Sequence, residues 1–214
     1  SEAAARGILY ADGYFADVMA EALKTAECNA CMKRIVAAPT AGSCGILPSA
    51  LLTLQEEKNI SDKDLVMALF TASAVGIVIA TNASVAGAAG GCQAECGAAS
   101  AMAAAAMVEL CGGTPKQCEH ACAIALKNIL GLVCDPVAGL VEIPCIKRNA
   151  GGVGNALVAA ELALAGVESH IPADEVIVAM KKIGDTMSST LKETAEGGLA
   201  VTPTGKKLCE KVFG

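Results

Sequence analysis

Aromatic residues are almost missing from this sequence, which has no Trp, two Tyr and three Phe among 214 residues. Hydrophobic residues nevertheless make up 54% of the chain, so Ala, Val, Leu and Ile carry the apolar content, together with 22 Gly. Small side chains let backbones approach closely, which favours closely packed helices around a deep core. The length fits one large domain or two small ones. We predict a single all-helical domain over residues 1–214.

Basic charge is also scarce. Lys and Arg number 16 against 22 Asp and Glu, and the net charge is −6. Lys147 and Arg148 are an isolated pair and no basic patch is present. A nucleic-acid partner is therefore not expected, because nothing would offset phosphate charge.

No secretion signal opens the chain, which begins Ser-Glu without an initiator Met. We expect that the upstream part of a longer protein is missing. Eleven Cys without a secretion signal indicate a reducing compartment and metal or redox chemistry, in place of a disulfide scaffold. The expected location is cytoplasmic.

Charged residues are absent from Leu65 to Gln93, a stretch long enough to span a bilayer. However, it holds several polar residues, and no Lys/Arg cluster or Trp/Tyr belt flanks it. A small membrane protein is therefore the weaker reading, and we expect no membrane partner. We predict instead a central uncharged helix, buried on all sides and ending near Ala80, around which an all-α domain packs.

Helical periodicity and Gly/Pro breaks divide the rest of the chain. Leu140–Ile143 could be a short extended piece, but no convincing strand is present. The Ser61 and Thr114 positions read as helix N-caps. The predicted helices cover residues 3–36, 48–58, 61–80, 92–111, 114–130 and 147–165, with another starting near 171 and a short last one in an irregular tail.

The cysteine spacing is compatible with several kinds of metal site. One pair has CxxC spacing and two pairs have the i, i+4 spacing of a helix face: Cys28/Cys31, Cys92/Cys96 and Cys118/Cys122. Each pair can be helix-face filler, because free Cys behaves as a small buried hydrophobe. Two i, i+4 pairs could also form a four-Cys zinc site in a helical interaction module.

Three cysteines stand out by their setting. Cys134 and Cys145 lie in an irregular, Gly/Pro-punctuated loop, and Cys92 begins a helix after a Gly-rich turn. A loop can aim sulfurs at one point and offer N–H groups to them, as iron–sulfur clusters require. A helix N-terminus favours the thiolate. Three thiolates on a four-iron cube would leave one iron open.

Six segments carry a recognisable family pattern: Ala38–Gly45, Asn82–Ser84, Gly90–Glu95, Gly131–Gly139, Val141–Ala150 and Glu193–Ala200. They resemble the catalytic α chain of bacterial iron–sulfur L-serine dehydratases, and the resemblance covers nearly the whole chain. The resemblance implies that a 4Fe–4S cluster, which a preparation could lose, is bound by Cys92, Cys134 and Cys145. Cys96 stands where relatives are expected to carry Val. We interpret Cys96 as a small apolar residue and not as a ligand. The same interpretation applies to Cys28, Cys31, Cys44, Cys111, Cys118, Cys122 and Cys209. It is least certain for Cys44, which lies beside the expected site.

The resemblance also implies partners. Family α chains extend upstream of Ser1, and a β subunit or β domain completes the enzyme. This chain alone could be inactive, and an oligomer is expected.

The implied reaction converts L-serine to pyruvate and ammonia without pyridoxal phosphate, in an aconitase-like way, with the open iron as a Lewis acid for the hydroxyl. A base must remove the α-proton. His120 reads as a surface helix residue and His170 as a loop residue, so the base is expected outside this chain. An L-cysteine desulfidase or related lyase with the same three cysteines is the alternative.

Substrate-binding residues are expected in the matched segments. Lys147 or Arg148 could capture the substrate carboxylate, Arg with bidentate geometry, although a solvated pair at a helix start is as good a reading. Thr40, Ser43, Asn82 and Ser84 could bind polar groups of the substrate, or could serve as caps and turns.

Overall fold

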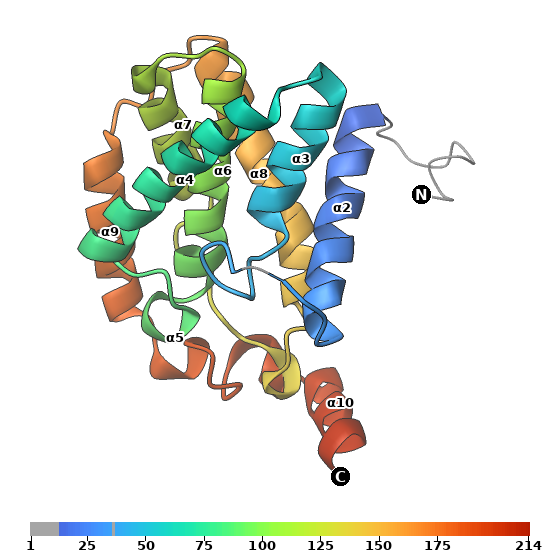
Figure 1. Ribbon diagram of the computed structural model, residues 1–214. Coiled ribbons are helices and arrows are strands. Elements are labelled where there is room, and N and C mark those ends of the chain that lie inside the picture. The colour runs from blue at the N-terminus through green and yellow to red at the C-terminus, as the bar shows by residue number, and fades with distance from the viewer. Residues whose placement is uncertain (1–12, 36) are drawn as a thin grey trace.

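Helix α6 (Ala98–Leu110) is the centre of a helical bundle in the computed structural model, which describes residues 13–35 and 37–214 (Figure 1). Every residue from Ala98 to Val108 is buried. Four helices pack around it: α3 (Ile46–Lys58), α4 (Asp62–Asn82), α7 (Pro115–Asn128) and α8 (Cys145–Leu164). The all-α prediction is confirmed, and the β pairing found among the described residues is a single bridge between Cys134 and Lys192.

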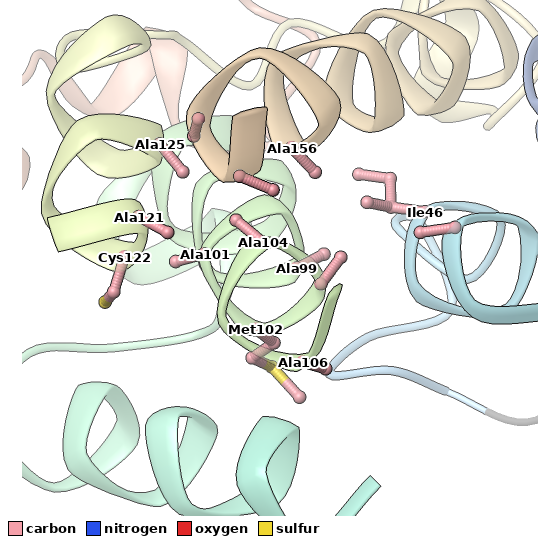
Figure 2. Close-up of a cluster of buried hydrophobic side chains, with 14 of the residues drawn as sticks. Ile46, Ala99, Ala101, Met102, Ala104, Ala106, Ala121, Cys122, Ala125 and Ala156 are labelled. Carbon is pink, nitrogen blue, oxygen red and sulfur yellow. The ribbon is translucent and has the colours of Figure 1, made fainter. Parts of the chain in front are cut away.

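The alanines of α6 explain why so many helices can surround it. Figure 2 shows its small side chains, Ala101 and Ala104 among them, between α7 and α8. Met102 is directed toward α4, where a Cβ on Gly76 would lie 3.0 Å from the Met102 sulfur. A helix with methyl groups on all sides has no polar face to leave in water, so it is buried all round.

The outer elements complete the bundle. Helix α2 (Gly13–Ala30) packs on α3 and α8, and α9 (Ala173–Thr186) packs on α7. The remaining short elements lie at one end of the bundle, the lower end in Figure 1. They are α5 (Gly87–Gly90), the π-helix η1 (Gln93–Gly97), the 3₁₀ turns η2 (Val137–Gly139), η3 (Ser189–Leu191) and η4 (Gly198–Val201), and α10 (Pro203–Phe213).

The helix starts agree with the sequence pattern. The Ser61 side chain accepts a hydrogen bond from the backbone N–H of Asp64. Thr114 and Gln117 form a reciprocal capping box with Pro115 at the first helical position. These local signals need no tertiary contact, which is why the sequence locates them.

The position of the central helix differs from the prediction. The uncharged stretch forms α4, whose buried residues are confined to one stripe of Ala68, Ala72, Gly76 and Ile79. Helix α4 is long and apolar enough to cross a membrane by length and composition, and 22% of its most apolar window is buried. The central, charge-free segment is residues 98–108 of α6. Lack of charge therefore did not identify the buried helix, whereas the run of alanines would have.

Three smaller expectations are also wrong. The first helix ends at Ala30, not Val36, and the part predicted for residues 3–12 lies outside the described residues. Of the possible extended piece Leu140–Ile143, Leu140 alone is extended, and the other three residues lie in a turn. Helix α8 begins at Cys145, so this cysteine lies at a helix start and not in a loop.

Candidate functional site

Cys92 lies at the entrance to the central helix. It follows Gly91, whose φ of 75° is left-handed, and it precedes the π-helix η1, which runs directly into α6. Its Sγ is 3.3 Å from the Sγ of Cys96, and both thiols are buried. The sequence therefore correctly predicts a helix start at Cys92. The widened π turn was not foreseen, and such turns are frequent at functional sites.

Gln93, the next residue, ties three segments together from a fully buried position. Its backbone N–H donates to the carbonyl of Leu132 at 2.9 Å, and its side-chain oxygen accepts from the N–H of Gly131 at 2.9 Å. Its side-chain amide donates to the carbonyl of Met180 at 2.9 Å. The loop that carries Cys134 is thereby fixed against the Cys92 turn.

Cys134 is held on both sides by backbone hydrogen bonds. Its N–H donates to the carbonyl of Leu191 and its carbonyl accepts from the N–H of Glu193, at 2.9 and 2.8 Å. The residue is 3% exposed. Segment 187–200, which reaches this point only through the tertiary fold, thus forms one wall beside the thiol.

Cys145 opens α8 one turn before the buried Asn149. The Asn149 amide donates to the carbonyls of Cys145 at 2.9 Å and Gly42 at 2.8 Å, and its oxygen accepts from the N–H of Gly45 at 2.8 Å. The loop of residues 37–45 is therefore pinned to the start of α8. Asn149 belongs to a segment that carries the family resemblance, but no sequence pattern predicts this role for it.

The three cysteine thiols lie close enough to influence one another. The hydrogen bond with Cys96 and then the Arg148 guanidinium lower the pKa of Cys92, against the opposing effect of burial. Burial and then the charge of Cys92 raise the pKa of Cys145 to about 12, and the same two causes raise the pKa of Cys134. Hydrogen bonds also connect their segments: Gln93 binds the Cys134 loop next to Cys92, and Arg148, three residues after Cys145, donates to the carbonyl of Val133.

Glu95 adds a buried carboxylate to this centre. Its Oε2 accepts a hydrogen bond from Thr40 Oγ1 at 2.5 Å, and its Oε1 lies 3.8 Å from Cys134 Sγ. Burial is the main cause that raises the pKa of Glu95. Ligand atoms of Glu95, Cys134 and Glu193 all lie within 4.8 Å of one another. The sequence reasoning missed Glu95, although its place one turn after Cys92 was a usable signal.

Glycines make room for the carboxylate and the thiol. A Cβ on Gly87 would collide with the Glu95 carboxylate and lie 3.0 Å from Cys134 Sγ. A Cβ on Gly42 would lie 2.9 Å from Glu95 Oε2. Backbone therefore approaches the centre from two directions, where any larger residue would fill the space.

Arg148 stabilises the Cys134 loop. Its guanidinium donates to the Val133 carbonyl at 2.9 Å and to Asp135 Oδ1 at 2.8 Å. Asp135 Oδ2 in turn accepts from the backbone N–H of Leu199 at 2.8 Å. Lys147 is exposed. Of the two basic residues expected to capture a carboxylate, the structure brings only Arg148 to the thiol centre, and that residue already binds Asp135.

The four polar substrate-binding candidates separate into two pairs. Thr40 and Ser43 lie in the pinned loop, 3.1 Å apart between their hydroxyl oxygens, with Thr40 bound to Glu95. Asn82 donates to the Val78 carbonyl of its own helix, and Ser84 accepts from the N–H of Ala86. The structure therefore places the first pair beside the thiols and engages the second pair in local caps and turns.

The two histidines lie apart from this centre. His120 was expected on the surface, but it is buried on α7, where its Nδ1 accepts from the N–H of Ser169. The surface prediction for His120 is wrong. It rested on the charged residues in the first turn of α7, whereas the α8–α9 connection covers the helix at His120. His170 is exposed in that connection, as expected.

All eleven cysteines are in the described part of the chain and are free thiols. Cys118 and Cys122 lie on α7, away from the convergence point, with burial raising the pKa of Cys122 to about 12. Among the described residues, the two i, i+4 pairs do not form a group of ligand atoms within 4.8 Å of one another, as a four-Cys zinc site would require.

Fold and site together define an all-α protein with a buried thiol and carboxylate centre where helices and loops converge. The family model for the serine dehydratase alpha chain matches residues 3–200, and the chain belongs to this family.

Curated relatives agree with this assignment. A probable L-serine dehydratase alpha chain of Bacillus subtilis is 59% identical over 198 residues, covering 92% of this chain and 66% of the relative. The L-serine dehydratase alpha chain of Peptoniphilus asaccharolyticus is 54% identical over 195 residues, covering 91% of this chain and 67% of the relative. An L-serine dehydratase of Streptomyces coelicolor is 46% identical over 182 residues, which are 84% of this chain and 40% of that protein.

Proposed function

We propose that this chain supplies the cluster-binding part of an L-serine dehydratase, with Cys92, Cys134 and Cys145 as the ligands of a 4Fe–4S cluster. The observation that supports the proposal is that hydrogen bonds of Gln93 and Arg148 tie the Cys92 turn, the Cys134 loop and the start of α8 to one another, beside the buried Glu95 carboxylate. Soft thiolates are the donor set that iron–sulfur clusters take. The backbone at Gly87 and Gly42 packs directly against the Glu95 carboxylate, and at Gly87 also against the Cys134 thiol, where a side chain would collide.

A bound cluster with one iron free of protein ligands would supply a Lewis acid for the serine hydroxyl. The chain's own residues would position the substrate. The Thr40 hydroxyl donates a hydrogen bond to Glu95, so the remaining lone pairs of the Thr40 oxygen and of the carboxylate can accept hydrogen bonds. Such acceptors suit the ammonium group of an amino acid. Asn149 and Arg148 would act as positioning residues, because they hold the loops that carry Thr40 and Cys134.

The general base and a β subunit or β domain are proposed to lie outside this chain. Neither histidine is bonded to a thiol or to Glu95 in the described part of the chain. Several relatives are named as alpha chains, which implies a second chain, while the longer Streptomyces protein is named as a whole enzyme. The relatives' names also favour serine over cysteine as the substrate. The eleven free thiols support a reducing, cytoplasmic location.

The decisive experiment is anaerobic reconstitution of the chain with iron and sulfide, followed by iron and sulfide analysis and visible absorbance. We expect about four irons per chain in the wild type. Alanine at Cys92, Cys134 or Cys145 is expected to abolish or strongly reduce this content. Cys96→Ala is the matched control. The Cys96 thiol lies 3.3 Å from the Cys92 thiol and is equally buried, but it is not a proposed ligand.

Two results would contradict the proposal. One is zinc without iron in the purified protein, which would favour a structural metal site. The other is loss of iron with Cys96→Ala equal to the loss with Cys92→Ala, which would change the ligand set. Serine and cysteine turnover with an added β partner would then test the reaction itself.

A further inference from the structure

Two of the buried cysteines contact each other directly. The Sγ atoms of Cys92 and Cys96 are 3.3 Å apart and share a hydrogen bond, and the two residues are 3% and 2% exposed. Cys92 directly precedes the π-helix η1, and Cys96 is the fourth residue of that helix. Cys92 is a proposed cluster ligand, whereas Cys96 has no role in the proposed function. The contact therefore places a thiol of unassigned function beside a proposed ligand.

The spacing of the two cysteines does not by itself produce this contact. Cys118 and Cys122 have the same i, i+4 spacing in the regular helix α7, but in the described part of the chain no sulfur–sulfur hydrogen bond joins them. Residues so spaced in an α-helix have Cβ atoms about 5–6 Å apart, whereas disulfides need about 3.5–4.5 Å. The π turn departs from α-helical geometry between Cys92 and Cys96, and their sulfurs meet.

We infer that Cys92 and Cys96 form a reversible disulfide in the cluster-free chain, and that this disulfide protects Cys92 from irreversible oxidation. The inference rests on the proposed function, because it takes Cys92 as a cluster ligand. A disulfide bond is about 2.05 Å long, so the two sulfurs must approach each other by about 1.2 Å. Because one sulfur cannot ligate iron and form a disulfide at the same time, cluster binding and the disulfide exclude each other.

The oxidant in this reaction is a peroxide. One thiol sulfur attacks a peroxide oxygen and the O–O bond breaks, which gives a sulfenic acid and one water. The second sulfur then attacks the sulfenic sulfur, so that the S–S bond forms, the S–O bond breaks and a second water leaves. Both thiol protons end in water, and the two sulfurs together give two electrons to the peroxide. A dithiol reductant reverses the oxidation by thiol–disulfide exchange.

Burial favours the internal disulfide over the competing reactions. A bulky disulfide such as oxidised glutathione cannot reach sulfurs that are 2–3% exposed, whereas hydrogen peroxide is little larger than water. A sulfenic acid at Cys92 already has the Cys96 sulfur in contact with it. Reaction within such a contact is fast compared with the arrival of a second peroxide, which would give an irreversible sulfinic acid. Cys96 therefore acts as the resolving thiol for Cys92.

Peptide mapping of the full chain tests the disulfide without reference to iron. The iron-free chain is reduced, separated from the reductant, treated with an equal amount of hydrogen peroxide, and alkylated in denaturant. Cleavage after glutamate separates Cys92 from Cys96, because Glu95 lies between them. We expect peptides 58–95 and 96–109 to remain joined, with a mass two hydrogen atoms below the sum of the two, and to separate after reduction.

Two variants provide the comparison. Cys122→Ala is the matched control, because it removes one thiol of the other i, i+4 pair, and the joined peptides are expected to persist. Cys96→Ala is expected to abolish them, and Cys92 should then gain two oxygen atoms as sulfinic acid when peroxide is in excess. Circular dichroism reports whether each variant folds. Cys96→Ser, with a side chain of nearly the same size, replaces Cys96→Ala if that variant does not fold.

Iron uptake tests the protection of Cys92. The chain is treated with excess peroxide, then with dithiothreitol, and is then reconstituted anaerobically with iron and sulfide. We expect the wild type and Cys122→Ala to regain the iron content of untreated protein. Cys96→Ala is expected to lose iron uptake under this treatment, although its untreated sample takes up iron normally.

The inference is overturned if peptides 58–95 and 96–109 separate without reduction, or if Cys92 is joined to a cysteine other than Cys96. Equal recovery of iron uptake in Cys96→Ala and the wild type would also overturn it. These failures are distinguishable from failure of the cluster proposal. If untreated wild type takes up no iron, the cluster proposal fails, whereas the peptide map still reports whether the disulfide forms.

Discussion

At the scale of single residues, the thiol centre depends on small backbone positions as much as on the thiols. Gly87 lies against both Glu95 and Cys134, and Gly42 lies against Glu95. The settings of Cys92 and Cys134 could be predicted from their sequence context, because a helix start and a Gly/Pro loop are local signals, whereas Cys145 lies at a helix start that was predicted two residues later. Glu95, Asn149 and Asp135 could not, because their partners are 13 to 107 residues away along the chain.

Replacing Gly87 by Ala is expected to lower the iron content after reconstitution and to destabilise the fold by about 1–3 kcal/mol, because the new methyl group collides with buried groups. The measurement is iron analysis together with urea unfolding. Gly151→Ala on α8 is the control, since a Cβ there meets nothing within 4 Å. That variant should keep its iron and gain about 0.5–1 kcal/mol in stability. Equal behaviour of the two variants would refute the role given to Gly87.

Replacing Arg148 by Met is expected to cost about 3 kcal/mol in unfolding free energy, because it leaves the buried Asp135 carboxylate without its cation. The Cys134 loop should also become easier to cleave by protease. The control is Lys181→Met, which removes an exposed pair with Asp185 and should cost about 0.5 kcal/mol or less. A small effect at Arg148 would argue that its guanidinium is free for a substrate carboxylate.

At the scale of elements, α6 and α4 show opposite outcomes for two apolar helices. Both contain long charge-free stretches, but α6 is buried on every side and α4 along a single stripe. Alanine allows close approach from all directions, whereas the large side chains of α4 gather on one face and remain exposed. Hydrophobicity alone therefore predicted correctly that both segments are helical, but it predicted wrongly which of the two helices is buried at the centre of the bundle.

Introducing a larger residue into α6 is expected to lower the free energy of unfolding, because the surrounding helices cannot move apart to make room for it. Ala104→Leu should destabilise the chain by about 1–3 kcal/mol or prevent folding, as seen by thermal denaturation. Val178→Leu on the exposed side of α9 adds a methylene group where there is space, and should change stability by less than about 0.5 kcal/mol. Tolerance of Leu at position 104 would mean that the centre of the bundle is loosely packed.

At the scale of the whole molecule, the start of η1 and the continuous stretch formed by the 131–144 loop and the start of α8 lie at one end of the bundle. If a cluster binds there, it links the start of η1, the 131–144 loop and the start of α8. A ligand that binds only the folded state stabilises it. Anaerobic reconstitution should therefore raise the melting temperature, by roughly 2–4 °C for each kcal/mol of binding energy. Hydrogen exchange should slow mainly in residues 131–144 and 187–200.

The same measurements on Cys134→Ala provide the control, because that variant lacks one of the three proposed thiolates. Its melting temperature should not respond to iron and sulfide. A response equal to that of the wild type would mean that stabilisation arises from iron bound elsewhere.

The sequence by itself determined the helical class and most helix starts, including the one at Cys92, because capping residues, periodicity and Gly/Pro breaks act over a few positions. The identity of the central helix, the burial of His120, the pairing of Arg148 with Asp135 and the arrival of Glu95 beside Cys134 were decided by the tertiary structure alone. Each of these depends on which faces of distant segments meet, and that is settled by packing volume across the whole bundle, which no local pattern encodes.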